Sequence, residues 1–436
     1  MPNIKFSPDQ QAAYDALTAG RSVFITGGAG TGKSTLVKEF CQGRKVARLA
    51  TTGAAAVLIG GQTLHSFFRV SPYIHKPGAI RDSQGVDFRS MKRIASFDTI
   101  LIDEISMARI DTFQAIIETL GRVKKMRNGK PFQLIAVGDF AQLPPVVTRE
   151  ERPALRQHYG DLLFAFEHPA WKSLEPHALN VIHRQSGDPT FAHWLSEVRR
   201  GNFPHADYVN QRVGPPPPGA VRLVTTNDAA KRLNDAEMNK LKTPDIIISG
   251  QIGGDFNEKN ARVPQTYRMR EGARVIICYN NPFGGYVNGS TGTLMRVQGR
   301  TGDPDRRAIV MLDSGKAVSV SSATWENVSY EQDQRGQYEP RVRGSFRQLP
   351  LLPGWAITVH RSQGMSLDRV HADLRNSFEA GQAYVALSRA TSLGGLTLEA
   401  PIDAADLAVN PKIGAYHEQI MREDERAEPE TGDLSC

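Results

Sequence analysis

The first residues that could do chemistry form a glycine-rich segment, GGAGTGKST, which runs from Gly27 to Thr35. It follows the apolar segment SVFIT and leads directly into the helical pattern KSTLVKEF, which is the setting of a phosphate-binding loop. Glycines let backbone N–H groups turn toward phosphates, while Lys33 can reach the β and γ phosphates and Ser34 can bind Mg2+. The segment therefore predicts a site for ATP and Mg2+, with contacts from Gly27, Gly28, Ala29, Gly30, Thr31, Gly32, Lys33, Ser34 and Thr35.

Two apolar segments further along the chain end in residues suited to hydrolysis. TILI ends at Asp103 and Glu104, and we expect Asp103 to bind Mg2+ while Glu104 orients the attacking water and accepts its proton. FQLIAVGD is followed by Gln142, which we interpret as a sensor of the γ-phosphate. Because ligands gather at the carboxyl ends of parallel strands, these side chains should meet Lys33 in one cleft. Taken alone, the acidic pair could instead cap a helix, and Gln142 could lie in an exposed loop.

The elements that must position these residues alternate between short apolar strands and helical stretches through the first half of the chain. That order predicts an α/β fold with a parallel sheet covered by helices, including buried strands at 99–102 and 134–137. After the proline run 215–218 the strand-then-helix order resumes, whereas residues 263–345 carry glycine-punctuated β patterns typical of a small barrel inserted in a second α/β domain. The polar segment 423–436 predicts a disordered tail.

Composition limits the class of protein. The 436 residues exceed one typical domain, and a hydrophobic share of 40% with a charged share of 23% is ordinary for a globular protein. The sequence contains no apolar run long enough to span a membrane and no signal-peptide pattern, and its three cysteines lack metal-ligand or disulfide spacing. We therefore expect a reducing, cytoplasmic compartment and no membrane partner. The net charge of +7 is compatible with a nucleic-acid partner but does not establish one.

Together these motifs resemble superfamily 1 helicases of subclass B, in the petite-integration-frequency (PIF) and RecD-like group. The glycine-rich loop is similar to motif I, DEISM to motif II and GDFAQLPPV to motif III, in the order and spacing of the family. FSPDQ resembles the Q motif, ATTGAAAVLIGGQTLHSF motif Ia, HRQ motif IV, WAITVHRSQGMSLDRV motif V and AYVALSRATS motif VI. The resemblance extends over most of the chain.

The resemblance implies an ATP-dependent DNA helicase with one ATPase site between two RecA-like motor domains. It assigns Arg184 and Arg389 as arginine fingers from the second motor, and it places Gln10, Gln363 and Gly364 at the nucleotide. Cations at the γ-phosphate are typically worth about 10³- to 10⁵-fold in rate, so the physical need agrees with the assignment. Gln10 is also explained by a capping box at the start of the first helix.

The resemblance also implies a domain organisation. The expected parts are a first motor at 1–170 with a pin insertion at about 68–92, a second motor at 171–262 and 346–422, the inserted β-barrel at 263–345 and the tail at 423–436. The segment 68–92 is much longer than a typical connection, and we interpret it as a pin that splits the duplex. An ordinary surface excursion is the alternative.

The family further implies 5′-to-3′ movement on single-stranded DNA. We expect a monomer that binds single-stranded DNA and single-strand/duplex junctions. The residues expected to face the strand are Thr51, Thr52, His65, Phe67, Tyr73, Asn288, Thr358, His360 and Ser362. Phe67 could equally belong to the core. Three other functions stay open from the residues alone: an NTPase switch without nucleic acid, an RNA helicase, and a nucleic-acid-binding module with an inactive ATPase site.

Overall fold

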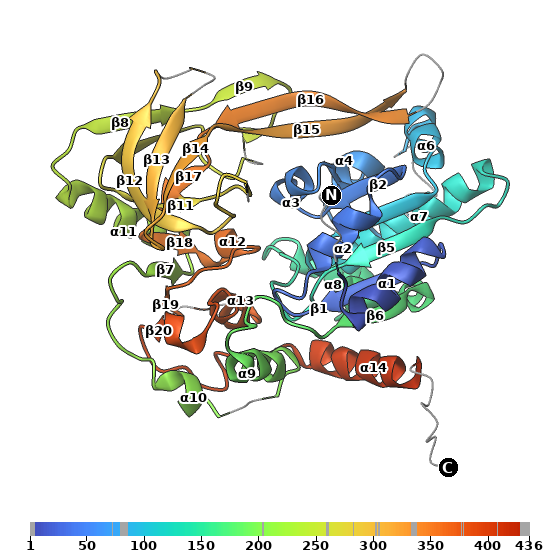
Figure 1. Ribbon diagram of the computed structural model, residues 1–436. Coiled ribbons are helices and arrows are strands. Elements are labelled where there is room, and N and C mark those ends of the chain that lie inside the picture. The colour runs from blue at the N-terminus through green and yellow to red at the C-terminus, as the bar shows by residue number, and fades with distance from the viewer. Residues whose placement is uncertain are drawn as a thin grey trace, which may run out of the picture.

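The computed structural model describes residues 5–427 except 72, 79–85, 203–204, 259–260, 282, 301–302, 304–305, 333–337, 376, 378 and 408. Two α/β motors lie side by side, and a region of long strands lies above the second motor (Figure 1). None of the helices within the described residues is long and apolar enough to cross a bilayer.

A six-stranded parallel sheet in the order β3-β2-β4-β5-β1-β6 forms the first motor. Its strands are β1 (Val23–Gly27), β2 (Val46–Ala50), β3 (Gln62–Thr63), β4 (Thr99–Asp103), β5 (Gln133–Val137) and β6 (Glu175–Leu179). The apolar residues of β1, β4 and β5 are buried because helices cover both faces of the sheet. The strands expected at 99–102 and 134–137 are confirmed.

The helices of the first motor are α1 (Pro8–Thr18), α2 (Lys33–Phe40), α3 (Gly53–Leu58), α4 (Leu64–Phe68), α6 (Phe88–Ala95), α7 (Ile110–Met126) and α8 (Arg152–Tyr159), with 3₁₀ turns at Ile105–Met107, Ala165–Glu167 and Pro169–Ser173. Helix α1 begins at the expected N-cap Ser7, whose N–H donates to Gln10 Oε1 at 3.1 Å, while the Gln10 N–H donates to Asp9 Oδ1 at 2.8 Å. The shared sheet edge places the N-terminus of α2 beside the ends of β4 and β5, where the catalytic residues are expected.

A four-stranded parallel sheet in the order β18-β7-β19-β20 forms the second motor. Its strands are β7 (Val221–Val224), β18 (Ala356–Thr358), β19 (Val370–Ala372) and β20 (Leu396–Leu398). Its helices are α9 (Pro189–Arg199), α10 (Asp207–Asn210), α11 (Asn227–Lys240), α12 (Val359–Ser362) and α13 (Gln382–Leu387), with a 3₁₀ turn at Leu393–Gly395. Two parallel sheets of this kind are typical of RecA-like motors.

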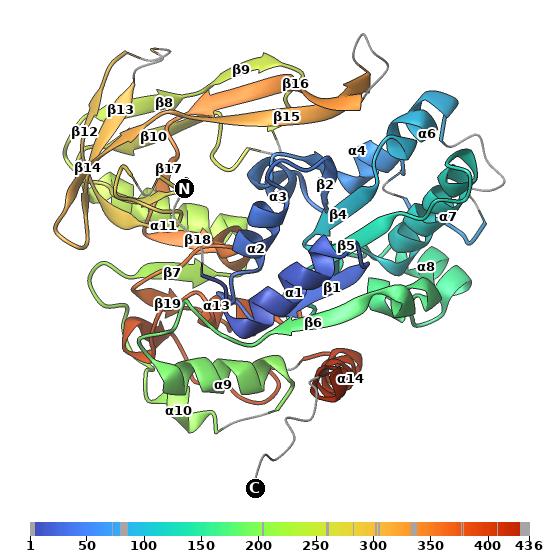
Figure 2. The same cartoon turned by 45° about the vertical axis from the view of Figure 1, so that its right-hand side comes forward.

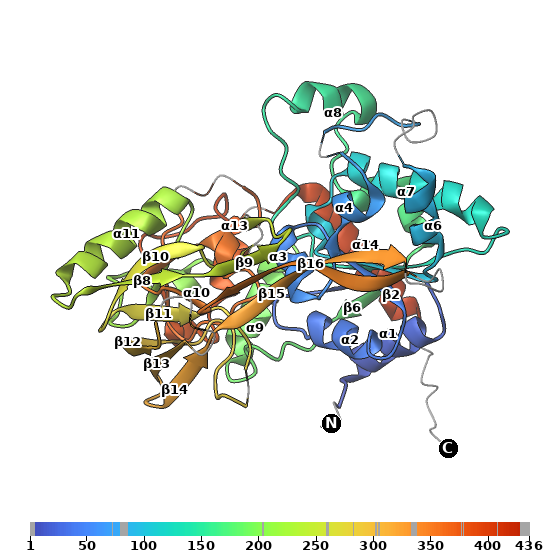
Figure 3. The same ribbon diagram turned by 90° about the horizontal axis from the view of Figure 1, so that it is seen from above.

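The inserted region is built from antiparallel strands rather than from one closed barrel. Its strands are β8 (Asp245–Ser249), β9 (Gln251–Gly254), β10 (Thr266–Arg270), β11 (Arg274–Ile277), β12 (Thr291–Gln298), β13 (Arg307–Leu312), β14 (Ala317–Ser321), β15 (Ala323–Gln332), β16 (Tyr338–Gln348) and β17 (Leu351–Pro353). The sheet β14-β13-β12-β11-β17 ends in two edge strands within the described residues, and β8 and β17 extend the region beyond the expected limits of 263–345. The β15–β16 ribbon reaches across to the first motor, where β15 contacts α3 and α6 (Figures 1 and 3).

Two further boundaries differ from the expected organisation. Strand β6 belongs to the sheet of the first motor, so that motor continues past residue 170. Helix α14 (Pro411–Ala427) leaves the second motor and packs on β6 (Figure 2), where the Tyr416 ring stacks on Phe166 at 4.3 Å between centroids. The expected disordered tail is therefore helical up to Ala427, and residues 428–436 lie outside the described part of the chain.

Candidate active site

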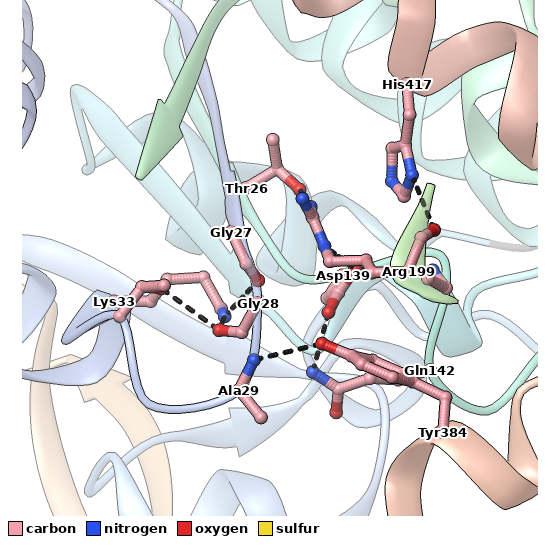
Figure 4. A network of polar contacts seen from close by, with 12 residues as sticks. Thr26, Gly27, Gly28, Ala29, Lys33, Asp139, Gln142, Arg199, Tyr384 and His417 are labelled. Atoms are coloured by element: carbon pink, nitrogen blue, oxygen red, sulfur yellow. Dashed lines mark hydrogen bonds and ion pairs between the residues drawn. The ribbon is translucent and has the colours of Figure 1, made fainter. Parts of the chain in front are cut away.

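The phosphate loop joins β1 to α2 and owes its shape to glycine. Gly30 and Gly32 adopt φ angles of +87° and +82°, a left-handed conformation in which a side chain would be strained. Lys33 opens α2, and its Nζ donates to the carbonyl oxygens of Gly27 at 2.7 Å and Gly28 at 2.9 Å (Figure 4). Burial lowers the pKa of Lys33 to about 8, although the nearby Asp139 carboxylate acts in the opposite direction. The ammonium must leave these carbonyls to reach a phosphate.

The two acidic residues lie at the end of β4, as the sequence predicts. Glu104 has a φ of +52°, which is uncommon for a residue with a side chain and reverses the backbone directly after Asp103. Its N–H donates to Asp103 Oδ1 at 2.9 Å, and its carbonyl oxygen accepts from Thr51 Oγ1 at 3.0 Å. Burial and the adjacent Asp103 carboxylate raise the pKa of Glu104 to about 7. A carboxylate with a pKa near neutrality is suited to act as a general base.

Gln142 is held at the end of β5 by a buried ion pair. Its Nε2 donates to Asp139 Oδ2 at 3.1 Å, while Asp139 Oδ1 accepts from Arg199 Nε at 2.9 Å (Figure 4). Arg199 also donates to Thr26 Oγ1 at 2.9 Å, directly before the phosphate loop. Burial acts to raise the pKa of Asp139, but the attraction of Arg199 and Lys33 outweighs it, and the pKa lies below its usual range. Asp139 is therefore a charged acceptor.

Side chains of the second motor complete the cleft. Gln363 Nε2 donates to Glu104 Oε2 at 3.2 Å and lies 3.4 Å from Gln142 Oε1, so one amide links both catalytic strand ends. The Ala29 N–H in the phosphate loop donates to the Tyr384 hydroxyl at 3.3 Å (Figure 4). The two motors therefore share polar contacts at the phosphate loop and at the residues that follow β4 and β5.

The two arginines expected to act as fingers, Arg184 and Arg389, donate hydrogen bonds to groups of the second motor. Arg184 donates to Ser366 Oγ at 2.7 Å and to Ser388 O at 3.2 Å. Arg389 is only 1% exposed; its Nε donates to Val385 O at 2.8 Å, and within the described residues its guanidinium forms no salt bridge. Burial and the charge of Arg184 lower the pKa of Arg389. Arg389 is buried and Arg184 is half-buried, and within the described residues neither pairs with a carboxylate, which favours an anionic ligand.

Comparison with known proteins agrees with this geometry. The family model of the PIF1-like helicases matches residues 5–208. The ATP-dependent DNA helicase Pif1 of Bdellovibrio bacteriovorus is 32% identical over 96% of this chain and 92% of its own length. The chain belongs to the PIF1-like helicase family. The human ATP-dependent DNA helicase PIF1 is also 32% identical, over 97% of this chain, but the match spans only 65% of the human protein.

Solved structures of the PIF1-like family show the same fold. Pif1 of a Bacteroides species in complex with ADP-AlF4 has a TM-score of 0.86 at 26% identity, over 97% of this chain and 98% of its own. The same Bacteroides protein bound to single-stranded DNA has a TM-score of 0.65 over the same shares of both chains. Unliganded Pif1 from the Bacteroides species also has a TM-score of 0.86, so the arrangement of this chain is closer to the structures with ADP-AlF4 or without ligand than to the one bound to single-stranded DNA.

The remaining residues expected at the nucleotide lie around the phosphate loop and at the end of α12, and they differ in their contacts and exposure. Gln10 donates from Nε2 to Thr31 O at 3.0 Å and lies 3.3 Å from His183 Nε2, so it contacts the phosphate loop in addition to capping α1. Ser34 and Thr35 are exposed in the first turn of α2. Gly364 follows Gln363 with a φ of +77° and ends the short helix α12.

Three residues expected to face DNA are buried instead. Phe67 is 0% exposed and packs against Phe68 and Phe97 in the core, so its ring is not available for stacking on bases. Ser362 is also 0% exposed, and its hydroxyl donates to Val359 O at 2.7 Å. Thr358 is 4% exposed, and its Oγ1 accepts from the Arg361 N–H as the cap of α12. Core packing of Phe67 and hydrogen bonds within and at the start of α12 account for the burial of these three side chains.

The other residues expected to contact DNA are at least partly exposed to solvent. Tyr73 is 76% exposed. The Nε2 atom of His360 lies 3.5 Å from Glu379 Oε2. Thr52 caps α3, His65 is partly buried in α4, and Asn288 lies in the turn between β11 and β12.

Sequence reasoning missed Arg199, Tyr384 and His417. Tyr384 lies within the segment AYVALSRATS, so its position beside an assigned arginine was an available signal. Arg199 and His417 carry no such signal, because each lies on an ordinary amphipathic helix and acquires its role only through folding.

Proposed function

We propose that this chain is an ATP-dependent DNA helicase that couples hydrolysis in the cleft to 5′-to-3′ movement along single-stranded DNA and to unwinding of the duplex. The observation that carries the proposal is the Gln363 bridge, in which one side chain of the second motor contacts Glu104 and Gln142 of the first. Because the hydrolytic residues are in contact across both motors, loss of the γ-phosphate can change how the motors sit on a strand.

Mg2+ fits the oxygen donors at the end of β4 and the start of α2. Asp103 and Ser34 would hold the ion, since Mg2+ needs only one or two protein oxygens and keeps several waters. Burial raises the pKa of Asp103, so a nearby cation would favour its ionised form. When bound, the ion neutralises charge on the β and γ phosphate oxygens.

Hydrolysis would use the remaining residues in separate roles. Glu104 accepts a proton from the attacking water, and Lys33 moves from the loop carbonyls to the phosphates. Arg184 and Arg389 stabilise the charge that develops on the transferring phosphoryl group. Since both arginines are bonded to groups of the second motor, closure of the cleft would deliver them together.

Single-stranded DNA would run over both motors, with Thr51, Thr52, His65, Asn288 and His360 as candidate contacts. Relatives support DNA binding, because Bacteroides Pif1 has been crystallised bound to single-stranded DNA and another Pif1 structure concerns DNA unwinding at forked duplex DNA. The described part of the pin insertion projects Tyr73 into solvent, while its base is anchored where the His75 N–H donates to Asp111 and Tyr159 donates to His75 O. A rigid base with an exposed aromatic tip suits a wedge.

ATPase assays with matched DNA and RNA single strands test the proposal. DNA should stimulate hydrolysis strongly, and added salt should remove the stimulation because phosphate contacts release counterions. Equal stimulation by RNA would indicate an RNA helicase. Salt-independent hydrolysis without any nucleic acid would favour an NTPase switch.

A further inference from the structure

Arg199 lies outside the sequence motifs, yet its side chain reaches the centre of the site. It is the last residue of α9, and its guanidinium inserts between the carboxyl ends of β1 and β5, which are neighbours in the first sheet (Figure 4). Nε donates to Asp139 Oδ1 and one terminal nitrogen donates to Thr26 Oγ1, both at 2.9 Å. The Arg199 side chain thus links β1, which precedes the phosphate loop, to the segment after β5 that carries Gln142.

The ion pair determines which end of the Gln142 amide faces the cleft. The Asp139 carboxylate can only accept hydrogen bonds, so the Gln142 NH2 group must point toward it. The amide oxygen of Gln142 is then turned to the cleft, where it lies 3.4 Å from Gln363 Nε2. Gln363 in turn donates to Glu104, the proposed base. A chain of side-chain hydrogen bonds therefore runs from α9 to the base.

We propose that Arg199 is a positioning residue for ATP hydrolysis, which acts through Asp139 to hold the oxygen of the Gln142 amide toward the cleft. There the oxygen can accept a hydrogen bond from the attacking water. The inference rests on the proposed function, because it requires that ATP is hydrolysed at this site. Within the described residues, Arg199 forms no hydrogen bond or ion pair with Asp103 or Glu104.

Arg199 also compensates the charge of Asp139, which attracts Lys33 as well. The Asp139 side chain is 0% exposed, and without Arg199 the charge that compensates its carboxylate would be that of Lys33, which the phosphates need. Removing the positive charge would therefore disturb nucleotide binding as well as the orientation of Gln142. Arg199→Lys keeps the charge but lacks the planar fork that bonds Asp139 and Thr26 at once, so it isolates the geometric role.

The C-terminal helix takes part in this arrangement. His417 Nδ1 of α14 lies 3.2 Å from the Arg199 carbonyl oxygen, and because a carbonyl only accepts, the ring donates from Nδ1 (Figure 4). Burial and the charge of Arg199 lower the pKa of His417 to about 3, so the ring remains neutral. Helix α14 thus fixes the end of α9 from which Arg199 extends.

The experiment compares DNA-stimulated ATPase kinetics of wild type, Arg199→Lys and Arg200→Lys. The control residue Arg200 is adjacent, 40% exposed and paired with Glu197 on the helix surface. We expect Arg199→Lys to lower kcat by about 10- to 100-fold, as a small misplacement of a reacting group does, with KM changed less than about threefold. Arg200→Lys should match wild type. In a Gln142→Ala background, Arg199→Lys should cause no further loss, because both substitutions disable the same group.

Unchanged kcat in Arg199→Lys, a defect in KM alone, or independent losses in the double variant would each overturn the inference. If Arg199→Lys does not fold, Asp139→Asn is the test, since it keeps the shape of the side chain; it should show the same fall in kcat and the same lack of additivity with Gln142→Ala. Wild type that hydrolyses no ATP would instead refute the proposed function.

Discussion

Alanine at Gly30 should slow hydrolysis by pushing the phosphate loop away from Arg184. Gly30 has a φ of +87°, and a Cβ atom there would lie 2.4 Å from Arg184 Cβ and 3.2 Å from Arg184 N. Carbon atoms pack at about 3.5–4.0 Å, so the two segments must separate by more than about 1 Å. The left-handed backbone costs about 1–2 kcal/mol and the overpacking about 1–3 kcal/mol, which sum to about 2–5 kcal/mol of unfolding free energy.

The matched control is Gly20→Ala. Gly20 has a φ of +78°, and a Cβ atom there would meet nothing within 4 Å, so only the backbone cost of about 1–2 kcal/mol applies. Urea denaturation measures the stability of both variants, and DNA-stimulated ATPase measures kcat. Gly20→Ala should keep the kcat of wild type, whereas Gly30→Ala should lose about 100-fold. Equal stability and equal kcat in the two variants would refute the argument from the Arg184 contact.

Four other outcomes follow from the site. Lys33→Ala should abolish ATP turnover while single-strand binding, measured by fluorescence anisotropy, persists; retained turnover would contradict the nucleotide site. Arg389→Ala should lower kcat much more than nucleotide affinity, and an affinity defect alone would place it elsewhere. Since burial raises the pKa of Glu104 to about 7 and the base must be ionised, kcat/KM should fall as pH decreases through 7, and Glu104→Gln should lack that dependence. A Gly/Ser linker in place of 73–77 should spare ATPase but reduce strand displacement; unchanged displacement would exclude the wedge.

The phosphate loop and the catalytic strand ends were predictable because their signals are local. A glycine pattern between a strand and a helix, and apolar runs that end in Asp103 or precede Gln142, are read directly from neighbouring residues. Parallel pairing then brings such strand ends to one sheet edge. This part of the site needed no long-range information.

The remaining features depend on contacts between distant segments. Strand β6 is an edge strand of sequence EPHAL, in which the first three residues are half-buried and only the last two are buried, so it lacks the continuous apolar signal that would have assigned it to the first motor. From the sequence alone, the phenylalanine at Phe67 could equally stack on bases or pack in the core, and only the packing of α4 distinguishes the two. Arg199 contacts Asp139 and Thr26 only because α9 ends beside β1 and β5, and no local sequence pattern predicts that arrangement.

Strand displacement on paired substrates that differ only in a 5′ or a 3′ single-stranded tail tests the central claim most directly, with Lys33→Ala as the matched inactive control. The account predicts ATP-dependent displacement from the 5′-tailed substrate by wild type, little from the 3′-tailed one, and none by the variant. Preference for the 3′ tail would contradict the proposed direction of movement. Equal displacement by Lys33→Ala, or by wild type without ATP, would contradict the claim that hydrolysis in the cleft between the motors drives unwinding.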